Sequence, residues 1–574
     1  MAGYRQLDAA GFTARCSTTI VLIALLSWSA AASAQSTANA GTTAQVHNLF
    51  QQERWQDIAN LHPALGISPD TDFEYGIALA RLEQWHDAKA ALRSGLRQSP
   101  RDPRFMVELA GVAFKQANYA EAEHWLRRAL HISAQDSYTL DFLGTVFYLQ
   151  GNIDAALKYW NRIGKPRIGS IEAQPKPKLN PILFDRAFAF SPASTPKLSD
   201  LRTTKARLEQ LNVFSSFRLS LEAQPDNTFN LTFRGSERNG CAGNSWACLL
   251  DIFGQMPEQT LNFSYFNIDS RATNFASMYR WDGEKRRAGA QVEFPLAGNP
   301  KWQLQAGTDL RNENWALRNS FSGSAPLFGA LNLKREVGFV RFNDVMSGTW
   351  QWFATTELSN RDYHNVFAAS VFAPNLLSAG FQLKQSFGIE GSVLRYPERR
   401  LSVGGTALLS IARLWSTPEH SYSQLQGSLR LQWFPQRTGE KYEVTHELRA
   451  GKTFGTPPFD EMFVLGVLGD TDLHMRAHIA TRDGKKGSAP LGRNYFLSNF
   501  AALRDFSPLA IAHIKVGPFV DTGHITDTLP LFGAHKWLWD AGLEAKLQAF
   551  GFTVTLSYGR DLRSGRNAWV GASP

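Results

Sequence analysis

Residues 424–433 read Gln-Leu-Gln-Gly-Ser-Leu-Arg-Leu-Gln-Trp, and apolar side chains alternate with polar ones along most of this run. The same period of two returns in residues 301–310 and 552–558. Successive side chains of a strand point to opposite faces, so each segment predicts a strand with one apolar and one polar face. Repetition of the pattern from about residue 259 onward predicts a closed antiparallel barrel with lipid outside and water inside.

Length and composition agree with a membrane barrel that carries soluble parts. The chain has 574 residues, of which 12% are aromatic and 19% charged, and its mean hydropathy is -0.26. The negative hydropathy argues against a polytopic helical membrane protein. At roughly 20 residues per strand and connection, residues 252–574 hold about 16 transmembrane strands. A soluble β-sandwich is the alternative, but it would not explain so many strands together with an export signal.

The N-terminus has the features of a secretion signal. Arg5 and Arg15 precede an apolar run at residues 20–26, and Ala32-Ser33-Ala34 forms an A-x-A cleavage site. We therefore expect residues 1–34 to be a signal peptide. Together with the barrel, it predicts the outer membrane of a Gram-negative bacterium, with the soluble parts in the periplasm.

Cys241 and Cys248 are the two cysteines that follow the signal sequence. In an oxidising compartment, a spacing of seven residues predicts a small disulfide loop. A metal site is the alternative, but no histidines lie nearby in the sequence.

Catalysis and nucleic-acid binding are not expected. The sequence has no G-x-S-x-G nucleophile elbow, zinc-ligand spacing, paired catalytic carboxylates or nucleotide motif, so we predict neither an enzyme nor a cofactor. The formal charge of +9 comes from scattered Lys and Arg residues, which form no recognisable nucleic-acid-binding module.

Residues 45–165 overlay on themselves at a spacing of 34. These columns resemble the tetratricopeptide repeat family, which implies an α-solenoid of three units. A degenerate half-unit around Trp55–Leu61 is expected as an N-terminal cap. Solenoids of this kind bind peptides or partner proteins on a concave face, and a passive spacer is the alternative. The clearest columns are Gly76, Ala110 and Gly144; Tyr75, Leu109 and Leu143; Ala88, Ala122 and Ala156; and Leu92, Leu126 and Trp160.

Residues 166–240 are predicted to contain a linker and then a small α+β module. The linker is indicated by several prolines between Gly164 and Pro196. A helical pattern at 198–212 precedes two alternating runs, which predict strands. Residues 207–217, Arg-Leu-Glu-Gln-Leu-Asn-Val-Phe-Ser-Ser-Phe, resemble the end of a POTRA (polypeptide-transport-associated) domain. The resemblance implies an edge strand that can pair with an extended client.

Phrases within the barrel resemble the BamA-type transporter superfamily, which includes two-partner secretion pores. Residues 472–478, Asp-Leu-His-Met-Arg-Ala-His, lie in the longest polar loop, where the family has its Val-Arg-Gly-Tyr/Phe lid motif. Residues 517–523, Gly-Pro-Phe-Val-Asp-Thr-Gly, resemble the inward-facing strand whose Asp holds the lid arginine. The resemblance implies that Arg476 reaches into the lumen and pairs with Asp521, while His478 replaces the usual aromatic residue.

These resemblances imply an outer-membrane polypeptide transporter or assembly factor, which captures periplasmic clients and inserts or secretes them. The expected partners are unfolded or extended periplasmic polypeptides, outer-membrane lipid, and partner proteins on the repeats. A polysaccharide export porin, which also joins tetratricopeptide repeats to a barrel, is the alternative, and a passive porin is a third. The POTRA-like segment and the phrases around Arg476 and Asp521 favour polypeptide transport.

Overall fold

The computed structural model describes residues 40–572, apart from residues 242–247, 249–255, 257–258, 369–371, 417–418, 468–472, 507–511, 530–536 and 550–551. The predicted signal peptide therefore lies outside the described residues. The chain divides after Gln150 into two compact units. Each unit is described by itself.

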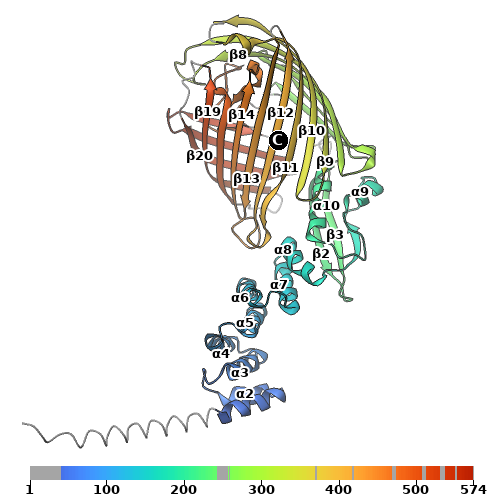
Figure 1. Ribbon diagram of the computed structural model, residues 1–574, viewed down its shortest axis with the longest axis vertical. Helices are drawn as coiled ribbons and strands as arrows, with labels where there is room; N and C mark the ends of the chain where they lie inside the picture. The colour runs from blue at the N-terminus through green and yellow to red at the C-terminus, as the bar shows by residue number, and fades with distance from the viewer. Residues whose placement is uncertain are drawn as a thin grey trace, which may run out of the picture. The chain divides into compact units, whose positions relative to one another are not determined.

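The first unit is a series of antiparallel helices, coloured blue in Figure 1. The residues that cap every second helix also follow the period of 34. Ser68, Asp102 and Asp136 each precede a helix and accept a hydrogen bond from a backbone N–H of its first turn. The helices are α2 (Trp55–Leu61), α3 (Pro69–Arg81), α4 (Trp85–Gln98), α5 (Pro103–Lys115), α6 (Tyr119–Ile132) and α7 (Ser137–Leu149).

The repeated small residues let the paired helices approach closely. A Cβ added to Gly76 would lie 2.7 Å from Leu92 Cγ, so α3 and α4 leave no room for a larger side chain. Ala88 and Ala122 are fully buried in the same way. Residues 40–51 are also helical, and their Val46 packs in one core with Ile58 of α2. The N-terminal cap is therefore a helix pair, where the sequence predicted a half-unit.

The second unit begins with α8 (Ile153–Trp160) and a short 3-10 turn, and continues into a small α+β module. The stretch that the sequence predicted as a linker contains a strand and a helix. Its strand β1 adds to the sheet in the order β1-β3-β2, parallel to β3, which short-range alternation could not indicate. The elements are β1 (Ile168–Ala173), α9 (Pro181–Ala187), α10 (Leu198–Gln210), β2 (Phe214–Ala223) and β3 (Phe229–Glu237).

The remaining strands form a closed antiparallel barrel (Figure 1). The sheet order contains 19 strands among the described residues, and three of them belong to the loop between β14 and β18 rather than to the wall. This agrees with the predicted fold class and with about 16 spanning strands. The wall comprises β4 (Gly240–Cys241), β5 (Thr260–Ile268), β6 (Thr273–Arg280), β7 (Lys285–Pro295), β8 (Trp302–Leu317), β9 (Gly329–Val345), β10 (Trp350–Phe367), β11 (Gly380–Tyr396), β12 (Leu401–Trp415), β13 (His420–Trp433), β14 (Tyr442–Gly455), β18 (Leu491–Asp505), β19 (Ala512–Thr528), β20 (Leu538–Ala549), β21 (Phe552–Asp561) and β22 (Asn567–Ala572).

Alternation along the strands separates an outer apolar face from an inner polar face. In β13, Leu425 is 51% exposed, whereas the adjacent Gln424 is 5% exposed. In β21, Leu556 is exposed and Ser557 is buried in the same manner. The outer side chains are those that lipid would cover, because in a closed barrel the other face is enclosed. The prediction made from residues 424–433 is confirmed.

Helices α8 and α10 brace the turns at one end of the barrel. Gly348, in the turn between β9 and β10, donates its N–H to Thr203 Oγ1 of α10 at 2.8 Å. Asn152, the residue before α8, donates its side-chain N–H to the carbonyl of Pro397 at 2.8 Å, in the turn between β11 and β12. Asp154 of α8 in turn pairs with Lys205 and Arg202 of α10. The α+β module is therefore held on the barrel by polar contacts from two helices.

Among the described residues, no helix has both the length and the apolarity needed to cross a membrane.

We expect a side chain at position 76 to disrupt the first unit. Gly76→Leu should lower the free energy of unfolding of the repeats by about 1–3 kcal/mol, because it overpacks the contact with Leu92. Gly111→Leu in α5 is the matched control, since a Cβ there has no neighbour closer than 4.0 Å. Thermal unfolding of both variants, followed by circular dichroism, measures the difference; equal destabilisation would contradict the packing argument.

We also expect acid to loosen α8 from α10. Burial alone would raise the pKa of Asp154, but Lys205 and Arg202 hold that pKa below its usual range. Because the folded-state pKa is lowered, the stabilisation is present above the ordinary Asp pKa of about 4 and is lost as pH falls through the folded value.

Hydrogen exchange of the α8 amides measures this loosening, after correction for intrinsic exchange rates. Protection should fall as the pH is lowered from neutral to below the folded-state pKa of Asp154. In Asp154→Asn, protection should already be low at neutral pH and should change less with acid. Equal pH dependence in both proteins would show that Asp154 does not hold the two helices together.

Candidate functional site in the barrel lumen

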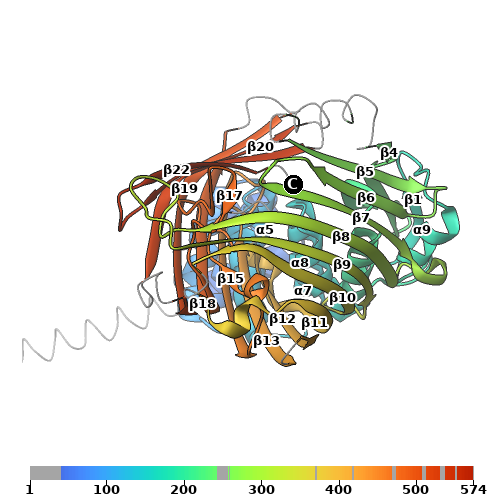
Figure 2. The same ribbon diagram turned by 90° about the horizontal axis from the view of Figure 1, so that it is seen from above.

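Residues 456–490, here called the lumen loop, connect β14 to β18, and their described parts, 456–467 and 473–490, fill part of the barrel interior. The two flanking strands pair directly with each other, so the loop is an insertion between neighbouring wall strands. It contains β15 (Phe463–Val464), β16 (Thr481–Arg482) and β17 (Lys485–Lys486). One of these, β17, pairs with β8 across the barrel. Figure 2 shows β15 and β17 inside the ring of wall strands.

Arg476 of the lumen loop contacts three wall strands. Its Nε lies 2.9 Å from Asp521 Oδ2 of β19, and its Nη2 pairs with the other carboxylate oxygen. Its Nη1 lies 2.7 Å from Glu544 Oε2 of β20, and its Nη2 also donates to the carbonyl of Phe500 in β18. The two residues predicted from sequence, Arg476 and Asp521, are thus brought together in a bidentate pair, the geometry that gives strong charge-assisted hydrogen bonds.

The surroundings of this pair fix both partners. The guanidinium of Arg476 lies 3.8 Å from the ring centre of Phe519, which precedes Asp521 by two residues and faces the same side of β19. The backbone N–H of Arg476 and the side-chain amide of Asn499 donate to the carboxylate of Asp521, at 2.9 and 2.8 Å. Asp521 has no exposed surface. Removing Arg476 would therefore leave a buried carboxylate without a cation.

Small wall residues make room for this part of the loop. A Cβ on Gly523 would lie 2.6 Å from Met475 Sδ, and one on Gly559 would lie 3.1 Å from the Cβ of Ala477. The loop therefore lies close against β19 and β21 at these two glycines, and a larger side chain at either position would press on it. Gly523 belongs to the segment 517–523, whose resemblance to the inward-facing strand was noted from sequence, whereas Gly559 lies outside that segment.

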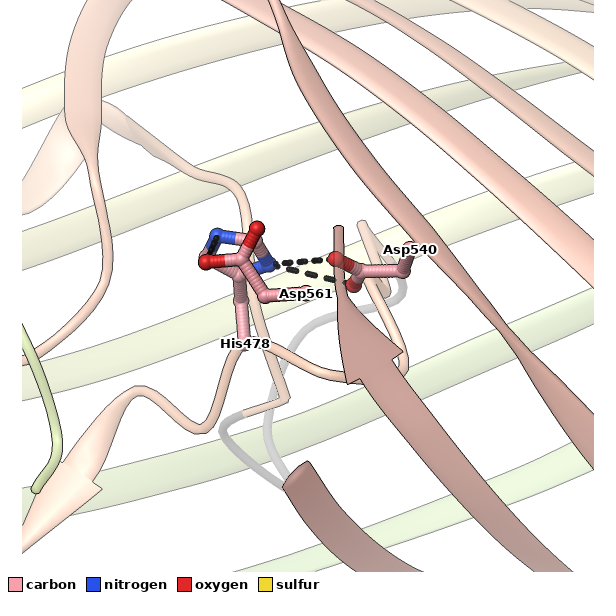
Figure 3. Close-up of side chains that lie close together, drawn as sticks. All are labelled: His478, Asp540 and Asp561. Atoms are coloured by element: carbon pink, nitrogen blue, oxygen red, sulfur yellow. Dashed lines mark hydrogen bonds and ion pairs between the residues drawn. The ribbon is translucent and has the colours of Figure 1, made fainter. Parts of the chain in front are cut away.

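His478 lies between two further wall carboxylates (Figure 3). Its Nδ1 is 3.0 Å from Asp540 Oδ1 of β20, and its Nε2 is 3.8 Å from Asp561 Oδ2 of β21. The backbone N–H of Ala477 also donates to Asp540, at 2.7 Å. At 3.8 Å the contact with Asp561 is longer than a hydrogen bond, so His478 is hydrogen-bonded to Asp540 and lies beside Asp561.

The same three side chains were considered as a metal site. One ligand atom from each of His478, Asp540 and Asp561 lies within 4.8 Å of the others, close enough for the three to share an ion. However, the two ring nitrogens face different carboxylates. A zinc ion takes one nitrogen per imidazole, and that imidazole must be neutral at the metal. We therefore assign hydrogen bonding rather than metal binding to this group.

A second group of charges holds the beginning of the lumen loop and was not predicted from sequence. Asp460 and Glu461 lie in a 3-10 turn (Phe459–Glu461), a few residues after the end of β14. Arg335 of β9 lies 2.9 Å from a carboxylate oxygen of each. Arg361 of β10 contacts Asp460 at 3.1 Å, and Lys384 of β11 contacts Glu461 at 3.1 Å. Three wall strands therefore bind this turn through ion pairs.

The returning arm of the loop is held by one further pair. Lys486 Nζ lies 2.6 Å from Glu313 Oε1 of β8, and both side chains are almost completely buried. The ammonium also lies 5.7 Å from the ring centre of Trp315, two residues further along the same strand. Both Glu313 and Trp315 fall in a strand that alternates inward and outward, so their inward orientation could have been inferred, but not their partner.

The predicted cysteine pair lies at the start of the barrel. Cys241 ends the short strand β4, and its sulfur is bonded to that of Cys248, with Cα atoms 5.5 Å apart.

Comparison with known proteins gives one sequence match and several distant structural ones. Residues 74–137 match the tetratricopeptide repeat model, which confirms the prediction of these repeats. A search of curated proteins finds no match. The chain is similar to the structure of BamA from Haemophilus ducreyi lacking POTRA domains 1–3, at 11% identity and a TM-score of 0.42, over 71% of this chain and 84% of that chain.

Two further solved structures are similar to the same extent. CdiB from Escherichia coli shows 11% identity and a TM-score of 0.44, over 72% of this chain and 75% of its own. CdiB from Acinetobacter baumannii shows 11% identity and a TM-score of 0.41, over 71% of this chain and 72% of its own.

Proposed function

We propose that the protein is an outer-membrane polypeptide transporter or assembly factor, whose barrel is closed by the lumen loop and opens for a client. The single observation that carries this proposal is the clamp of Arg476 on Asp521 and Glu544 inside a closed barrel. A passive pore has no need of a buried, multi-strand grip on a loop that fills its own lumen. A loop held by a few charged contacts can be released when those contacts are exchanged for others.

The contacts of Arg476 are strong enough to hold the lumen loop in the closed barrel, and they are confined to a few neighbouring strands, so a local change can break them. Breaking a buried ion pair by removing one partner costs about 3–5 kcal/mol, because the remaining charge is left without a counterion. Arg476 makes its contacts with β18, β19 and β20, so a change in the spacing of these strands would weaken several bonds together.

The α+β module offers a place for an extended client. Strand β2 is at one edge of the three-stranded sheet and, in the part of the chain that the structure describes, pairs only with β3. An edge strand presents backbone N–H and C=O groups that can pair with another strand. We assign this role to the POTRA-like module and place it, with the repeats, in the periplasm. The predicted signal peptide supports this placement.

In the part of the chain that the structure describes, the seam of the barrel, where β22 meets β4, is short on both sides. Strand β22 pairs with β21 from Asn567 to Ala572, and β4 contributes two residue pairs to β5. A closing strand with few hydrogen bonds can exchange its partner more readily than one with a full ladder. This supports membrane insertion of clients at the seam, beside secretion through the lumen.

Polysaccharide export is the second candidate function, because tetratricopeptide repeats precede a barrel in the same chain. It would require the lumen to conduct a neutral or acidic glycan. The two functions differ in which molecule disappears from the cell surface when the protein is removed.

We predict that neutralising Asp521 opens the channel. Asp521→Asn leaves Arg476 without its bidentate partner, and the resulting loss of about 3–5 kcal/mol should raise the frequency of open states in planar bilayers. Asp527→Asn is the matched control, because Asp527 lies on the same strand in a half-exposed pair with Arg493. Exchanging the two charges, in Arg476→Asp with Asp521→Arg, should restore part of the closed state. Wild-type conductance in Asp521→Asn would refute the clamp.

We predict that depletion of the protein removes polypeptides from the outer membrane or the cell surface. Surface and outer-membrane proteomics after depletion would measure this. Loss of one secreted protein would indicate dedicated secretion, and loss of many barrels would indicate general assembly. Loss of glycan with an unchanged set of surface proteins would instead support the export porin.

A further inference from the structure

The lumen loop is fixed in two places that differ in composition. Its root consists of residues 459–464 and 480–490, whose buried ion pairs are made with β8 to β11, while the short strand β15 within it pairs with β18. Its tip consists of residues 473–478, which lie against β18 to β21. We propose that Asp460 and Glu461 are positioning residues that keep the root on the barrel wall while the tip is released. This inference rests on the proposed function, since it describes how the closed channel opens.

The root network joins many groups at short distances. Beyond the ion pairs of Arg335, Arg361 and Lys384, the hydroxyl of Tyr363 donates to Asp460 at 2.9 Å. Gln424 of β13 donates to the backbone carbonyl of Glu461 at 2.8 Å. Arg361, whose side chain has no exposed surface, also donates to Gln382 at 2.7 Å. Strands β9, β10, β11 and β13 therefore all bind the same turn.

The charges of the root balance, whereas those of the tip do not. At the root, three cations face three carboxylates: Arg335, Arg361 and Lys384 against Glu357, Asp460 and Glu461. At the tip, the two cations Arg476 and Lys546 and the imidazole of His478 face four carboxylates. These are Asp521, Glu544, Asp540 and Asp561, and His478 lies between the last two. Buried excess charge of one sign is costly, so the tip is the weaker attachment even when His478 is protonated.

The apolar side chains of the loop pack in two separate clusters. Phe459, Met462 and Val464 of the first arm share one buried cluster with Ala480 and Ala489 of the returning arm, and this cluster extends over β8 and β9. Leu473 and Met475 of the tip belong to a separate and smaller cluster, together with Phe463 and Leu465 of the first arm and residues of β18 and β19. Release of the tip would expose the smaller cluster and leave the larger one intact.

The two arms are joined to each other between root and tip. Val467 donates its N–H to the carbonyl of His478 at 2.8 Å, and Ala480 donates to the carbonyl of Val467 at 3.0 Å. A Cβ on Gly466 would lie 2.6 Å from the Cβ of Ala489, so the arms are in close contact there. These bonds tie Val467 to the tip at His478 and to the root at Ala480, so in the proposed opening they mark the boundary between the released and the fixed part of the loop.

Thiol labelling of the full-length mature protein in detergent or vesicles tests the proposal. Met475→Cys reports on the tip and Met462→Cys on the root, and both methionines are buried. Cys241 and Cys248 are bonded to each other, so the introduced thiol is the one that reacts. The measured quantity is the rate of reaction with a small charged maleimide in each background.

In the Arg476→Ala background, we expect the labelling rate at position 475 to rise by about tenfold or more, because the tip opens locally, and the rate at position 462 to stay at its original value. In the Glu461→Gln background, the rate at position 462 should rise, and Glu461→Asp, which keeps the charge, should return it toward the original value. Arg413→Ala is the matched control, because Arg413 forms an exposed pair with Glu419 outside the lumen.

The outcomes separate this inference from the proposed function. Equal rises at both positions in Arg476→Ala would mean that the whole loop leaves the lumen together, which overturns the fixed root and retains the clamp. No rise at position 475 would overturn the clamp itself, and with it the proposed opening. The labelling rates at positions 475 and 462 in Arg476→Ala test the inference even if Glu461→Gln fails to fold. Gel migration of the unboiled Glu461→Gln protein would reveal such a failure.

Discussion

A carboxylate that has lost all contact with solvent requires a cation or several hydrogen-bond donors, and the interior of this barrel is organised by that requirement. Asp521 and Asp540 both lie on wall strands with no exposed surface. Neither could be accommodated by the wall alone, because alternation places only a few side chains within reach. The lumen loop supplies Arg476 to Asp521 and His478 to Asp540. Each buried carboxylate of the wall thus has its partner in the loop.

This dependence links the loop to the shape of the wall. The loop reaches the carboxylates because Gly523 and Gly559 carry no side chain at the points of closest approach. Its root reaches the opposite wall through Arg335 and Arg361, which project inward from β9 and β10. A loop that is bound to opposite sides of a barrel links the positions of the two walls. Changing the spacing of the strands and releasing the loop are therefore coupled, in whichever order they occur.

Local patterns predicted much of the architecture, because their physical causes are local. The period of two in residues 424–433 and the period of 34 in the repeats follow from side-chain direction and helix packing within a few turns. The pairing of Arg476 with Asp521 was reached through resemblance alone, and the structure places the two side chains in contact. By contrast, β1 lies in a proline-rich stretch and joins its sheet through β3, some sixty residues later, so no local signal marked it.

The root network shows why half of the candidate site escaped prediction. Arg335, Arg361 and Lys384 come from three successive strands, where each reads as one more inward-facing polar residue. Their shared partners, Asp460 and Glu461, follow β14 in a polar loop, where acidic residues are ordinary. Only closure of the barrel brings the five together, because closure sets which inward positions face each other. Charge balance inside a barrel is thus a property of the closed sheet, and a sequence reveals it only after strand register has been assigned.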